Sequence, residues 1–233
     1  MNLPRHVVLV PDGNRRWAKK RGKPSFFGHR AGMKSAERVF RAALDENLEC
    51  LTFWGCSVNN LTERSEAEVK FLYILFDQAF RKFLRSMSFL KKHKIRVRVL
   101  GRWEEFFPAG LQRTTKKLVK ETESFSGRNL TFLMAYNGMD EMVSAVRKVV
   151  KSGVRPEDVE RDTIKRNLWT KDLPPVDLVV RTGGEPHWSA GLMMWEVAEA
   201  KLYFTNTTWP DFDPKELKKA LTEYSRTERR FGK

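Results

Sequence analysis

Cysteine is scarce in this sequence, since only Cys50 and Cys56 occur among 233 residues. Two thiols at this spacing provide neither a disulfide framework nor a structural zinc site. Long hydrophobic runs are lacking as well, because none approaches the roughly 20 residues that cross a bilayer. No N-terminal stretch has the pattern of a signal peptide. These absences argue against a disulfide-stapled scaffold and a membrane-spanning protein, and we expect a cytoplasmic location.

Negative charge is also in short supply. The sequence holds 44 lysines and arginines against 29 aspartates and glutamates, a formal net charge of +15. Such an excess favours an anionic partner: a phosphate-bearing substrate, an anionic membrane surface or nucleic acid. No RNA-binding signature occurs and the aromatic residues fall in core patterns, so we expect no nucleic acid among the partners.

Apolar runs alternate with helical patterns along the whole chain. The runs predict strands at His6–Val10, Leu51–Cys56, Ile95–Leu100, Leu130–Ala135, Val176–Arg181 and Leu202–Thr205. Helical periodicity predicts helices at about 29–47, 66–92, 108–123, 139–151, 156–168, 189–199 and 214–226. This alternation predicts an α/β fold with a mostly parallel sheet of about six strands flanked by helices. Without repeats or long linkers, we expect a single domain at 1–233.

The predicted helix at 66–92 has two notable features. Ser65 and Glu68 have the spacing of a capping box, in which each side chain bonds the other residue's amide. The apolar stripe that follows is wider than one packing face needs, because Phe71 and Leu75 extend it. Such a stripe is typical of core, and it would also suit the wall of an apolar cavity.

A turn directly after the first predicted strand combines an acidic residue with two arginines. Asp12, Gly13 and Asn14 favour a tight turn, and Arg15 and Arg16 follow at the start of a helical pattern. Amides at a helix start and guanidinium groups attract anions, and a carboxylate can hold a divalent cation. The turn offers the groups that bind a metal-bridged diphosphate, although a capped surface turn could have the same residues.

The strand predicted at Val176–Arg181 ends in a similar turn. Its motif is Arg181-Thr182-Gly183-Gly184-Glu185, again with an arginine at the strand end and glycines behind it. Ligands of open parallel sheets bind outside the carboxyl ends of the strands. The positions of both turns therefore suit ligand binding.

Four sequence blocks, in this order, resemble the cis-prenyltransferases, the family of undecaprenyl diphosphate synthase. The blocks are Asp12-Gly13-Asn14-Arg15-Arg16-Trp17-Ala18, Phe27-Gly28-His29 with Gly32, Arg181-Thr182-Gly183-Gly184-Glu185, and Trp209-Pro210-Asp211-Phe212. The resemblance runs from about His6 to Lys233 and includes the closing block Glu228–Lys233. It implies one catalytic domain with a hydrophobic tunnel beside the sheet, walled partly by the long helix, that holds an isoprenoid chain.

The resemblance implies that the first turn binds an allylic diphosphate. Asp12 takes the place of the essential acid, which handles Mg²⁺ and assists departure of the diphosphate. Substrate-binding positions in or near this turn are Gly13, Asn14, Arg15, Arg16, Trp17 and His29. At the position of Arg15 many members have glycine and some have arginine. Ser25 stands where an arginine often touches the allylic diphosphate.

A second implied group follows the second predicted strand. Ser57 and Asn60 keep the family pattern and are assigned catalytic roles, and Asn60 matches the residue that positions the acceptor and its proton loss. Asn59 and Leu61 replace a glutamate and an aromatic residue of the family. Arg64 matches a diphosphate-binding arginine after one inserted residue.

The implied acceptor site departs most from the family. Arg181 and Ser189 match residues that bind isopentenyl diphosphate. His187 stands where a second arginine is usual, and Lys201 replaces a glutamate that helps to hold Mg²⁺ across a dimer. A lysine could contact diphosphate directly, as a flexible point charge and not as a bidentate fork. These departures leave open a different acceptor, as in relatives that join two allylic units head to middle.

The resemblance as a whole implies a homodimeric cis-prenyltransferase that extends an allylic prenyl diphosphate with isopentenyl diphosphate and requires Mg²⁺. A peripheral membrane contact is compatible with the charge. A non-catalytic subunit of a heteromeric enzyme is disfavoured, because such subunits usually lack the aspartate found at Asp12. The bulky residues Trp54, Phe71 and Tyr73, near the expected tunnel, predict a product of short to medium length.

Overall fold

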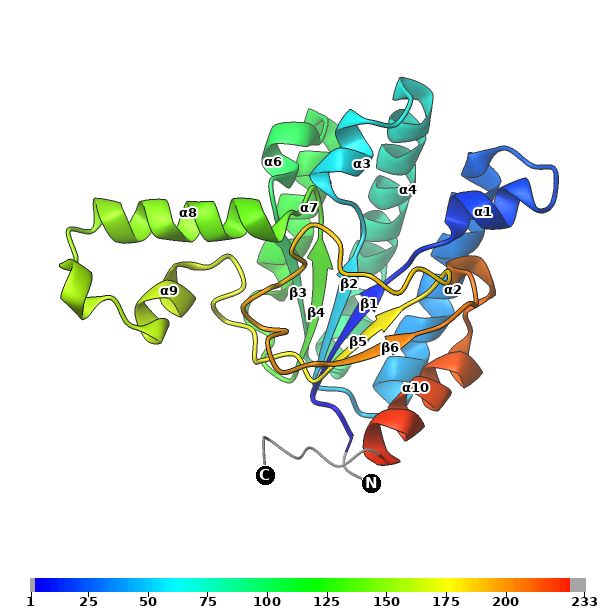
Figure 1. The fold of residues 1–233 in the computed structure, drawn as a ribbon. Helices are drawn as coiled ribbons and strands as arrows, with labels where there is room; N and C mark the ends of the chain where they lie inside the picture. Colours follow the sequence, from blue (N-terminus) through cyan, green and yellow to red (C-terminus); the bar gives the residue numbers. More distant parts are fainter. Residues whose placement is uncertain (1–2, 227–233) are drawn as a thin grey trace.

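One six-stranded sheet organises the computed structural model, which describes residues 3–226 and leaves the block Glu228–Lys233 outside the described residues. All neighbouring strands are parallel, in the spatial order β3-β4-β2-β1-β5-β6. The strands are β1 (His6–Val10), β2 (Cys50–Trp54), β3 (Ile95–Leu100), β4 (Arg128–Leu133), β5 (Leu178–Arg181) and β6 (Lys201–Phe204). The expected α/β fold around one sheet is confirmed (Figure 1).

The central strands are buried on both faces, as expected for a parallel sheet. Every residue of β1 is buried, and its side chains alternate between two hydrophobic clusters. Val7 and Leu9 join the cluster on one face, while Val8 and Val10 join the cluster on the other. All six predicted runs form strands, with ends that differ from the predictions by no more than two residues.

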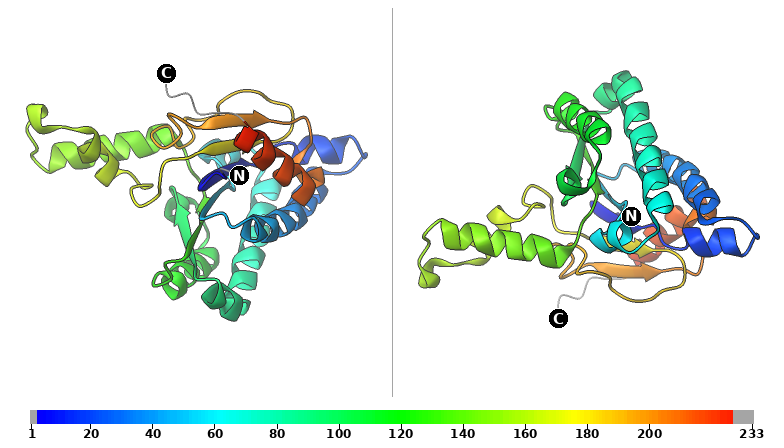
Figure 2. Two further views of the ribbon diagram at one scale, coloured as in Figure 1. Left: turned by 90° about the horizontal axis from the view of Figure 1, so that it is seen from below. Right: turned by 90° about the horizontal axis from the view of Figure 1, so that it is seen from above.

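Helices cover one face of the sheet. They are α2 (Ser25–Asp45), α4 (Glu66–Arg85), α5 (Met87–Lys92), α7 (Ala109–Thr122) and α10 (Pro214–Arg226), and their apolar residues form the larger cluster (Figures 1 and 2). The helix predicted at 66–92 is interrupted at Ser86, whose ψ of 28° departs from helical geometry and separates α4 from α5.

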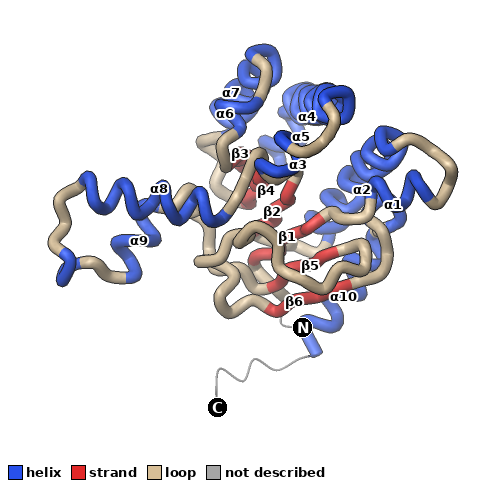
Figure 3. Tube along the Cα trace, turned by 45° about the horizontal axis from the view of Figure 1, so that its top comes forward, coloured by secondary structure: helices blue, strands red, loops and turns tan. Residues whose placement is uncertain are grey.

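An irregular segment covers part of the other face, and the helix predicted at 189–199 is wrong. Ala190, Gly191 and Met193 have φ values of 48°, 57° and 43°, in the left-handed region, so a right-handed helix cannot continue through them. The segment still buries Leu192 and Val197 against the sheet. The predicted helix at 139–151 forms α8 (Gly138–Lys151), which projects from the sheet together with α9 (Arg161–Asn167) (Figures 1 and 3).

Five short elements complete the described chain: α1 (Asn14–Lys19), α3 (Val58–Thr62), α6 (Trp103–Phe106), and the 3₁₀ turns η1 (Pro156–Asp158) and η2 (Trp209–Asp211). The helix predicted at 156–168 divides into η1 and α9, and α3 and α6 were not predicted. No helix within residues 3–226 is long and apolar enough to cross a membrane.

The strand order determines where a site can form. β1 pairs with β2 on one side and with β5 on the other, although β5 lies far along the chain. The order of strands reverses beside β1, and ligands of such sheets bind in the crevice outside the carboxyl ends at this point. The turns after β1, β2 and β5 therefore meet at one edge.

Candidate functional site

The turn after β1 places Asp12 at the carboxyl edge of the sheet. Gly13 has a left-handed backbone with a φ of 101°, and its amide donates to the Asp12 carboxylate over 2.6 Å. A Cβ atom on Gly13 would lie 2.9 Å from the side chain of Thr208, so conformation and space both require glycine. The glycine thereby fixes the direction of the Asp12 carboxylate.

Arg181, the last residue of β5, lies against this carboxylate. Its Nη2 atom donates to Asp12 Oδ2 over 3.1 Å, and its Nη1 atom donates to Ser189 Oγ over 2.7 Å and to the His187 carbonyl over 2.8 Å. The side chain of Arg181 is only 8% exposed. His187 Nε2 lies 3.0 Å from Ser189 Oγ, so three of the predicted acceptor residues come together.

A second arginine contacts the other oxygen of Asp12. Arg16 Nη2 lies 3.1 Å from Asp12 Oδ1, and Arg16 Nη1 donates to Glu185 Oε1 over 2.9 Å. Each Asp12 oxygen thus has a guanidinium partner. The carboxylates of Asp12 and Glu185 thus pair with the guanidinium groups of Arg16 and Arg181.

Glu68 is a site residue that the sequence reasoning missed. Only half of the predicted capping box forms, because Ser65 Oγ accepts the Glu68 amide over 3.4 Å while the Glu68 carboxylate turns away. Its Oε1 atom lies 2.9 Å from His29 Nε2 and 3.3 Å from Arg64 Nη1, and its Oε2 atom accepts Ser25 Oγ over 3.3 Å. Its spacing from Ser65 pointed to a cap, and no sequence signal linked Glu68 to His29.

Burial determines the charge states in this second cluster. It lowers the pKa of His29, so the ring is neutral at neutral pH and its Nε2–H donates to Glu68. Burial also lowers the pKa of Arg64. Burial acts to raise the pKa of Glu68, but the hydrogen bond from His29 and the charge of Arg64 outweigh it and leave that pKa low. Glu68 therefore stays ionised and fixes the tautomer of His29.

Ser57 and Asn60 form a capping box at the start of α3. The Asn60 amide donates to Ser57 Oγ over 3.1 Å, and the Ser57 amide donates to Asn60 Oδ1 over 3.3 Å. Each side chain thus satisfies a backbone amide that would otherwise lack a partner. This cap holds both residues at the carboxyl edge beside β2.

A cavity of about 680 Å³ opens at this edge. It is half polar, and its apolar wall includes Trp54, Leu72 and Phe76. The predicted site residues that line it are Asp12, Asn14, His29, Ser57, Asn60, Arg64, Arg181, His187 and Ser189. Most of the predicted site residues are therefore brought together, from segments that are far apart in the sequence.

The other predicted site residues lie outside the cavity lining. Gly13 shapes the turn, Arg16 holds Asp12 from the side, and Arg15 is exposed on α1. Trp17 points toward η2 and donates its Nε1–H to Asp211 over 2.7 Å.

Lys201 begins β6, at the end of the sheet opposite the cavity. Its Nζ atom donates to the Tyr224 carbonyl over 3.1 Å and lies 4.6 Å from the centre of the Tyr224 ring. Within one chain, Lys201 is thus not part of the cavity lining.

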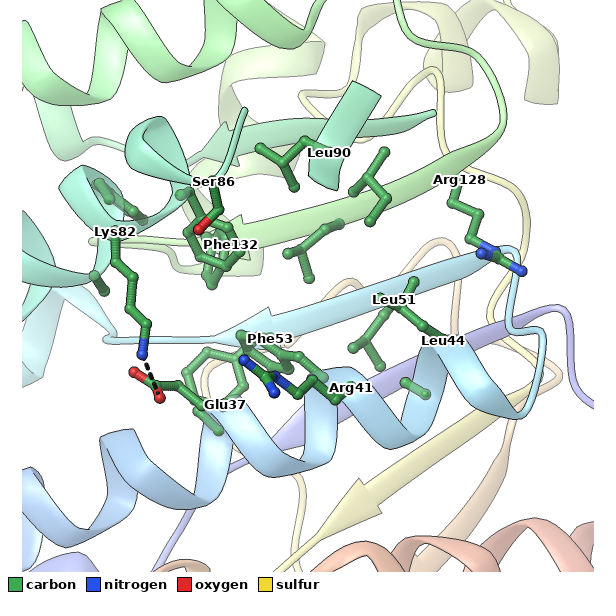
Figure 4. A pocket seen from close by; sticks show the side chains of 18 of the residues that line it. Glu37, Arg41, Leu44, Leu51, Phe53, Lys82, Ser86, Leu90, Arg128 and Phe132 are labelled. Atoms are coloured by element: carbon green, nitrogen blue, oxygen red, sulfur yellow. Dashed lines mark hydrogen bonds and ion pairs between the residues drawn. The ribbon is translucent and has the colours of Figure 1, made fainter. Parts of the chain in front are cut away.

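A second, apolar cavity of about 270 Å³ adjoins the first between α2, α4 and the sheet. Met33, Phe53 and Phe76 line both cavities. Figure 4 shows this cavity, whose lining includes Phe132, Leu51 and the Glu37–Lys82 ion pair of 2.7 Å. An apolar group bound at the polar edge would find further apolar space behind it.

The three bulky residues expected near the tunnel are placed differently from one another. Trp54 lines the polar cavity. Phe71 packs against Phe26 with ring centres 5.6 Å apart, and Tyr73 packs against Phe107 at 5.6 Å. Phe71 and Tyr73 line neither cavity, so they provide no basis for the predicted product length.

The described residues include no cluster of three or more histidine, cysteine, aspartate or glutamate side chains that could hold a metal ion. Asp12 is the carboxylate that lines the cavity. Mg²⁺ commonly binds one or two carboxylates together with substrate phosphates and water. The donor set at this edge thus fits a magnesium ion that is held largely by a bound diphosphate.

Comparison with known proteins assigns the chain to a family. The family model described as "Putative undecaprenyl diphosphate synthase" matches residues 10–232. A ditrans,polycis-undecaprenyl-diphosphate synthase of Buchnera aphidicola, named as specific for (2E,6E)-farnesyl diphosphate, is 39% identical over 100% of this chain and 92% of its own length. A tritrans,polycis-undecaprenyl-diphosphate synthase of Thermococcus kodakarensis, named as specific for geranylgeranyl diphosphate, is 33% identical over 100% of this chain and 88% of its own length.

A solved structure supports the same assignment. Lavandulyl diphosphate synthase from Lavandula x intermedia, in complex with dimethylallyl diphosphate, aligns with a TM-score of 0.90 and 30% identity over 99% of both chains. The sheet, the polar edge and the sequence matches agree, and the chain belongs to the cis-prenyltransferase family of undecaprenyl diphosphate synthase.

Proposed function

We propose that this prenyltransferase condenses an allylic prenyl diphosphate with isopentenyl diphosphate to make a longer prenyl diphosphate. The observation that carries the proposal is the position of Asp12, between Arg16 and Arg181, at a polar cavity that adjoins an apolar one. The polar groups suit diphosphates, and the apolar space suits a prenyl chain, since each buried CH₂ contributes about 0.8 kcal/mol.

The reaction requires stabilisation of the leaving group. The C–O bond of the allylic diphosphate breaks, and its electron pair leaves with the diphosphate. The terminal alkene carbon of the acceptor forms the new C–C bond, and the acceptor then loses a proton. Arg16 and Arg64 are proposed to hold the departing diphosphate, because preorganised donors lower the barrier where charge develops. His29, whose Nε2–H donates to Glu68, lines the site beside them.

Asp12 is proposed to bind Mg²⁺ together with the diphosphate. When bound, Mg²⁺ neutralises the charge on the phosphate oxygens. A cation on Asp12 would also replace Arg16 and Arg181 as the counter-charge of this carboxylate. Their guanidinium groups could then donate to phosphate oxygens, as charge-assisted bonds that are roughly twice as strong as neutral ones.

The acceptor is proposed to bind on the Arg181 side. Arg181, Ser189 and His187 already form one hydrogen-bonded group there. Ser57 and Asn60, which are held in place by their cap, line the same cavity and are proposed to position the acceptor for proton loss.

A second copy of the chain is proposed to cover two exposed apolar surfaces. In the edge strand β6, Leu202 and Phe204 are 45% and 39% exposed. Along α8, Val146 and Val150 are 47% and 74% exposed. Burial of such surfaces is the main driving force of association, and a dimer could bring Lys201 of one chain toward the partner's cavity.

The proposal is tested with purified protein, Mg²⁺, labelled isopentenyl diphosphate and a panel of allylic primers, with mass spectrometry of the products. The two relatives differ in the primer that their names give, so the panel includes farnesyl and geranylgeranyl diphosphates. Incubation with dimethylallyl diphosphate alone tests head-to-middle coupling. If two dimethylallyl diphosphates were coupled in that incubation and no primer were elongated with isopentenyl diphosphate, the main proposal would be overturned. Light scattering after gel filtration tests the dimer.

A further inference from the structure

A surface outside the cavity combines exposed aromatic rings with basic side chains. It lies where the α1–α2 connection protrudes from the molecule and meets the start of α4 (Figures 1 and 2). We define this surface as the aromatic–basic corner, made of Lys23, Phe26, Phe27, Arg30 and Phe71.

Ring contacts make the corner continuous. Phe26 and Phe27 are 41% and 40% exposed, and their rings stack with centres 4.9 Å apart. Phe26 also contacts Phe71, at 5.6 Å. Lys23 Nζ lies 5.5 Å from the centre of the Phe27 ring, and the Arg30 guanidinium lies 5.8 Å from that of Phe71.

Positive charge dominates the surrounding sequence. Between Asp12 and Glu37 there are eight lysines and arginines and no acidic residue. Seven of these cations are exposed, and five of the seven fall between the last turn of α1 and the second turn of α2: Lys19, Lys20, Arg21, Lys23 and Arg30. Of these, only Arg21 has an ion pair within residues 3–226, with Asp211 at 3.5 Å.

Acidic groups on the adjacent helix α4 do not cancel this charge. Glu66 pairs with Lys70 at 2.5 Å on the exposed side of the helix. Glu68 is buried against His29 and Arg64. Both acidic residues in the first turn of α4 are therefore paired, and the corner presents lysines and arginines beside them.

We propose that the aromatic–basic corner docks onto an anionic lipid bilayer. Phenylalanine side chains enter the boundary between headgroups and acyl chains, while lysine and arginine pair with anionic headgroups. Single-stranded nucleic acid is a poorer occupant, because base stacking requires free ring faces. Here the faces of Phe26 and Phe27 stack on each other, and Lys23 lies over Phe27.

The benefit of membrane docking to this protein rests on the proposed function, because that function makes an apolar product. The same helices carry the corner and line the cavity, through His29 on α2 and Leu72 on α4. Docking at the corner would hold the cavity close to the bilayer that receives an apolar product.

Vesicle co-sedimentation without any substrate tests the proposal. Phosphatidylcholine vesicles with and without phosphatidylglycerol are compared, using the full chain. We expect binding only to the vesicles with phosphatidylglycerol, and its loss at about 1 M salt, where the Debye length is about 3 Å. Lys19→Gln with Lys20→Gln and Lys23→Gln should weaken binding about 100-fold, at about fivefold per cation.

The aromatic part has its own variant and matched controls. Phe26→Ser with Phe27→Ser should weaken binding at least about tenfold. Phe89→Ser removes a ring of similar exposure, 43%, on α5, and should leave binding unchanged. The control for charge is Lys91→Gln with Lys92→Gln and Lys117→Gln. Thermal unfolding establishes that each variant is folded.

Three outcomes would overturn the proposal. The wild type could fail to bind anionic vesicles, it could bind neutral ones equally, or the control variants could weaken binding as much as the corner variants. Poly(U) RNA binding that displaces vesicles and is insensitive to Phe26→Ser would identify a general polyanion surface instead. Because prenyl transfer is assayed separately and without vesicles, a failure of docking is distinguishable from a failure of the proposed function.

Discussion

Arg181 Nη2 and Asp12 Oδ2 lie 3.1 Å apart, although 169 residues separate them in the chain. They meet because β5 pairs in parallel with β1, which aligns the carboxyl ends of both strands. Asp12 is therefore the counter-ion of a nearly buried guanidinium as well as the carboxylate of the cavity. A change at Asp12 is expected to affect both roles.

Replacement of Asp12 should abolish turnover and leave the chain folded. Asp12→Ala removes the proposed ligand of Mg²⁺, and preorganised charges of this kind are worth several kcal/mol. Arg181 keeps its bonds to Ser189 and His187, so the free energy of unfolding should fall by no more than about 3 kcal/mol. Steady-state rates and urea unfolding measure the two effects.

Asp211→Asn is the control, because Asp211 pairs with Arg21 on the surface and not with the cavity. It should keep nearly full activity. If Asp12→Ala retained more than about a tenth of the wild-type rate, less than about 1.4 kcal/mol of barrier would depend on Asp12. That result would contradict its proposed role.

Glu68→Gln should impair the allylic site by removing the charge that holds Arg64. A glutamine can still accept from His29 but lacks the charge that pairs with Arg64. Loss of one charge-assisted contact costs about 1.5–3 kcal/mol. We expect kcat/KM for the allylic substrate to fall about tenfold to a hundredfold, with a smaller effect on KM for isopentenyl diphosphate.

Glu66→Gln provides the matched comparison on the same helix. Glu66 pairs with Lys70 and its side chain is 81% exposed, so the substitution should change neither parameter measurably. A purely structural role of Glu68 would lower stability and leave kcat/KM of the remaining folded protein unchanged. That pattern would refute its role in positioning Arg64 at the allylic site.

The fold was largely predictable because buried parallel strands are short apolar runs with clear ends. His6–Val10 and Ile95–Leu100 match their predictions at both ends. The segment at 189–199 was not predictable in this way. Its apolar residues have helical spacing, but the left-handed conformations at Ala190 and Met193 come from tertiary packing against the sheet.

The candidate site was predictable where motifs follow strands. Asp12 and Arg181 belong to such motifs, and a parallel sheet brings their strand ends together. Glu68 could not be found, because its contact with His29 depends on how α2 packs beside α4 and not on local sequence. The direction of Trp17 could not be found for the same reason, since only tertiary structure shows that it points toward Asp211.

His6 should make stability depend on pH below neutrality. The ring is fully buried; its Nδ1–H donates to the Pro174 carbonyl over 2.9 Å, and its Nε2 accepts from Thr52 Oγ1 over 2.8 Å. Burial lowers the pKa of His6 to about 4, below the usual 6.5. Between these values the unfolded chain binds a proton that the native state does not, so stability falls as pH decreases.

The contribution of His6 should be fully present above about pH 6.5 and should decline by about 3 kcal/mol by about pH 4. His6→Gln lacks the titrating group and should show a shallower loss over this window. Urea unfolding of both proteins from pH 7 to pH 4 measures the difference. Parallel curves for wild type and variant would show that His6 is protonated equally in both states.

Product length should respond to the size of the apolar cavity. Phe83 lines it and lies 5.8 Å from Phe132, measured between ring centres. Phe83→Ala should enlarge the space and shift the products to longer chains, with a stability loss of about 2 kcal/mol for a half-buried ring. Phe106→Ala removes a half-buried ring outside both cavities and should not change the distribution.

Of the three bulky residues, Trp54 alone lines a cavity, and on it rests the prediction that the wild-type product is short to medium. Mass spectrometry of the same reactions measures the product length. A dominant product of about eleven isoprene units or longer would contradict this prediction. An unchanged distribution in Phe83→Ala, with folding intact, would mean that the chain grows elsewhere.

The acceptor site should gain affinity from the double change His187→Arg with Lys201→Glu. His187 lies beside Arg181 and Ser189 in the cavity, so an arginine there would add a charge-assisted donor in the same chain. Lys201 lies at the opposite end of the sheet, so its change can act on a cavity only across a dimer. One added contact is worth about 1.5–3 kcal/mol.

The apparent KM for isopentenyl diphosphate should therefore fall about tenfold to a hundredfold, and activity should depend more sharply on Mg²⁺. The single variant His187→Arg separates the effect within one chain from the effect across the dimer. If the wild type uses a different acceptor, the double change should instead harm that activity and create elongation. A lower KM and a new elongation activity would each require contact between the changed residues and the bound diphosphate. If acceptor choice and metal dependence both stayed unchanged, neither residue would belong to the acceptor site.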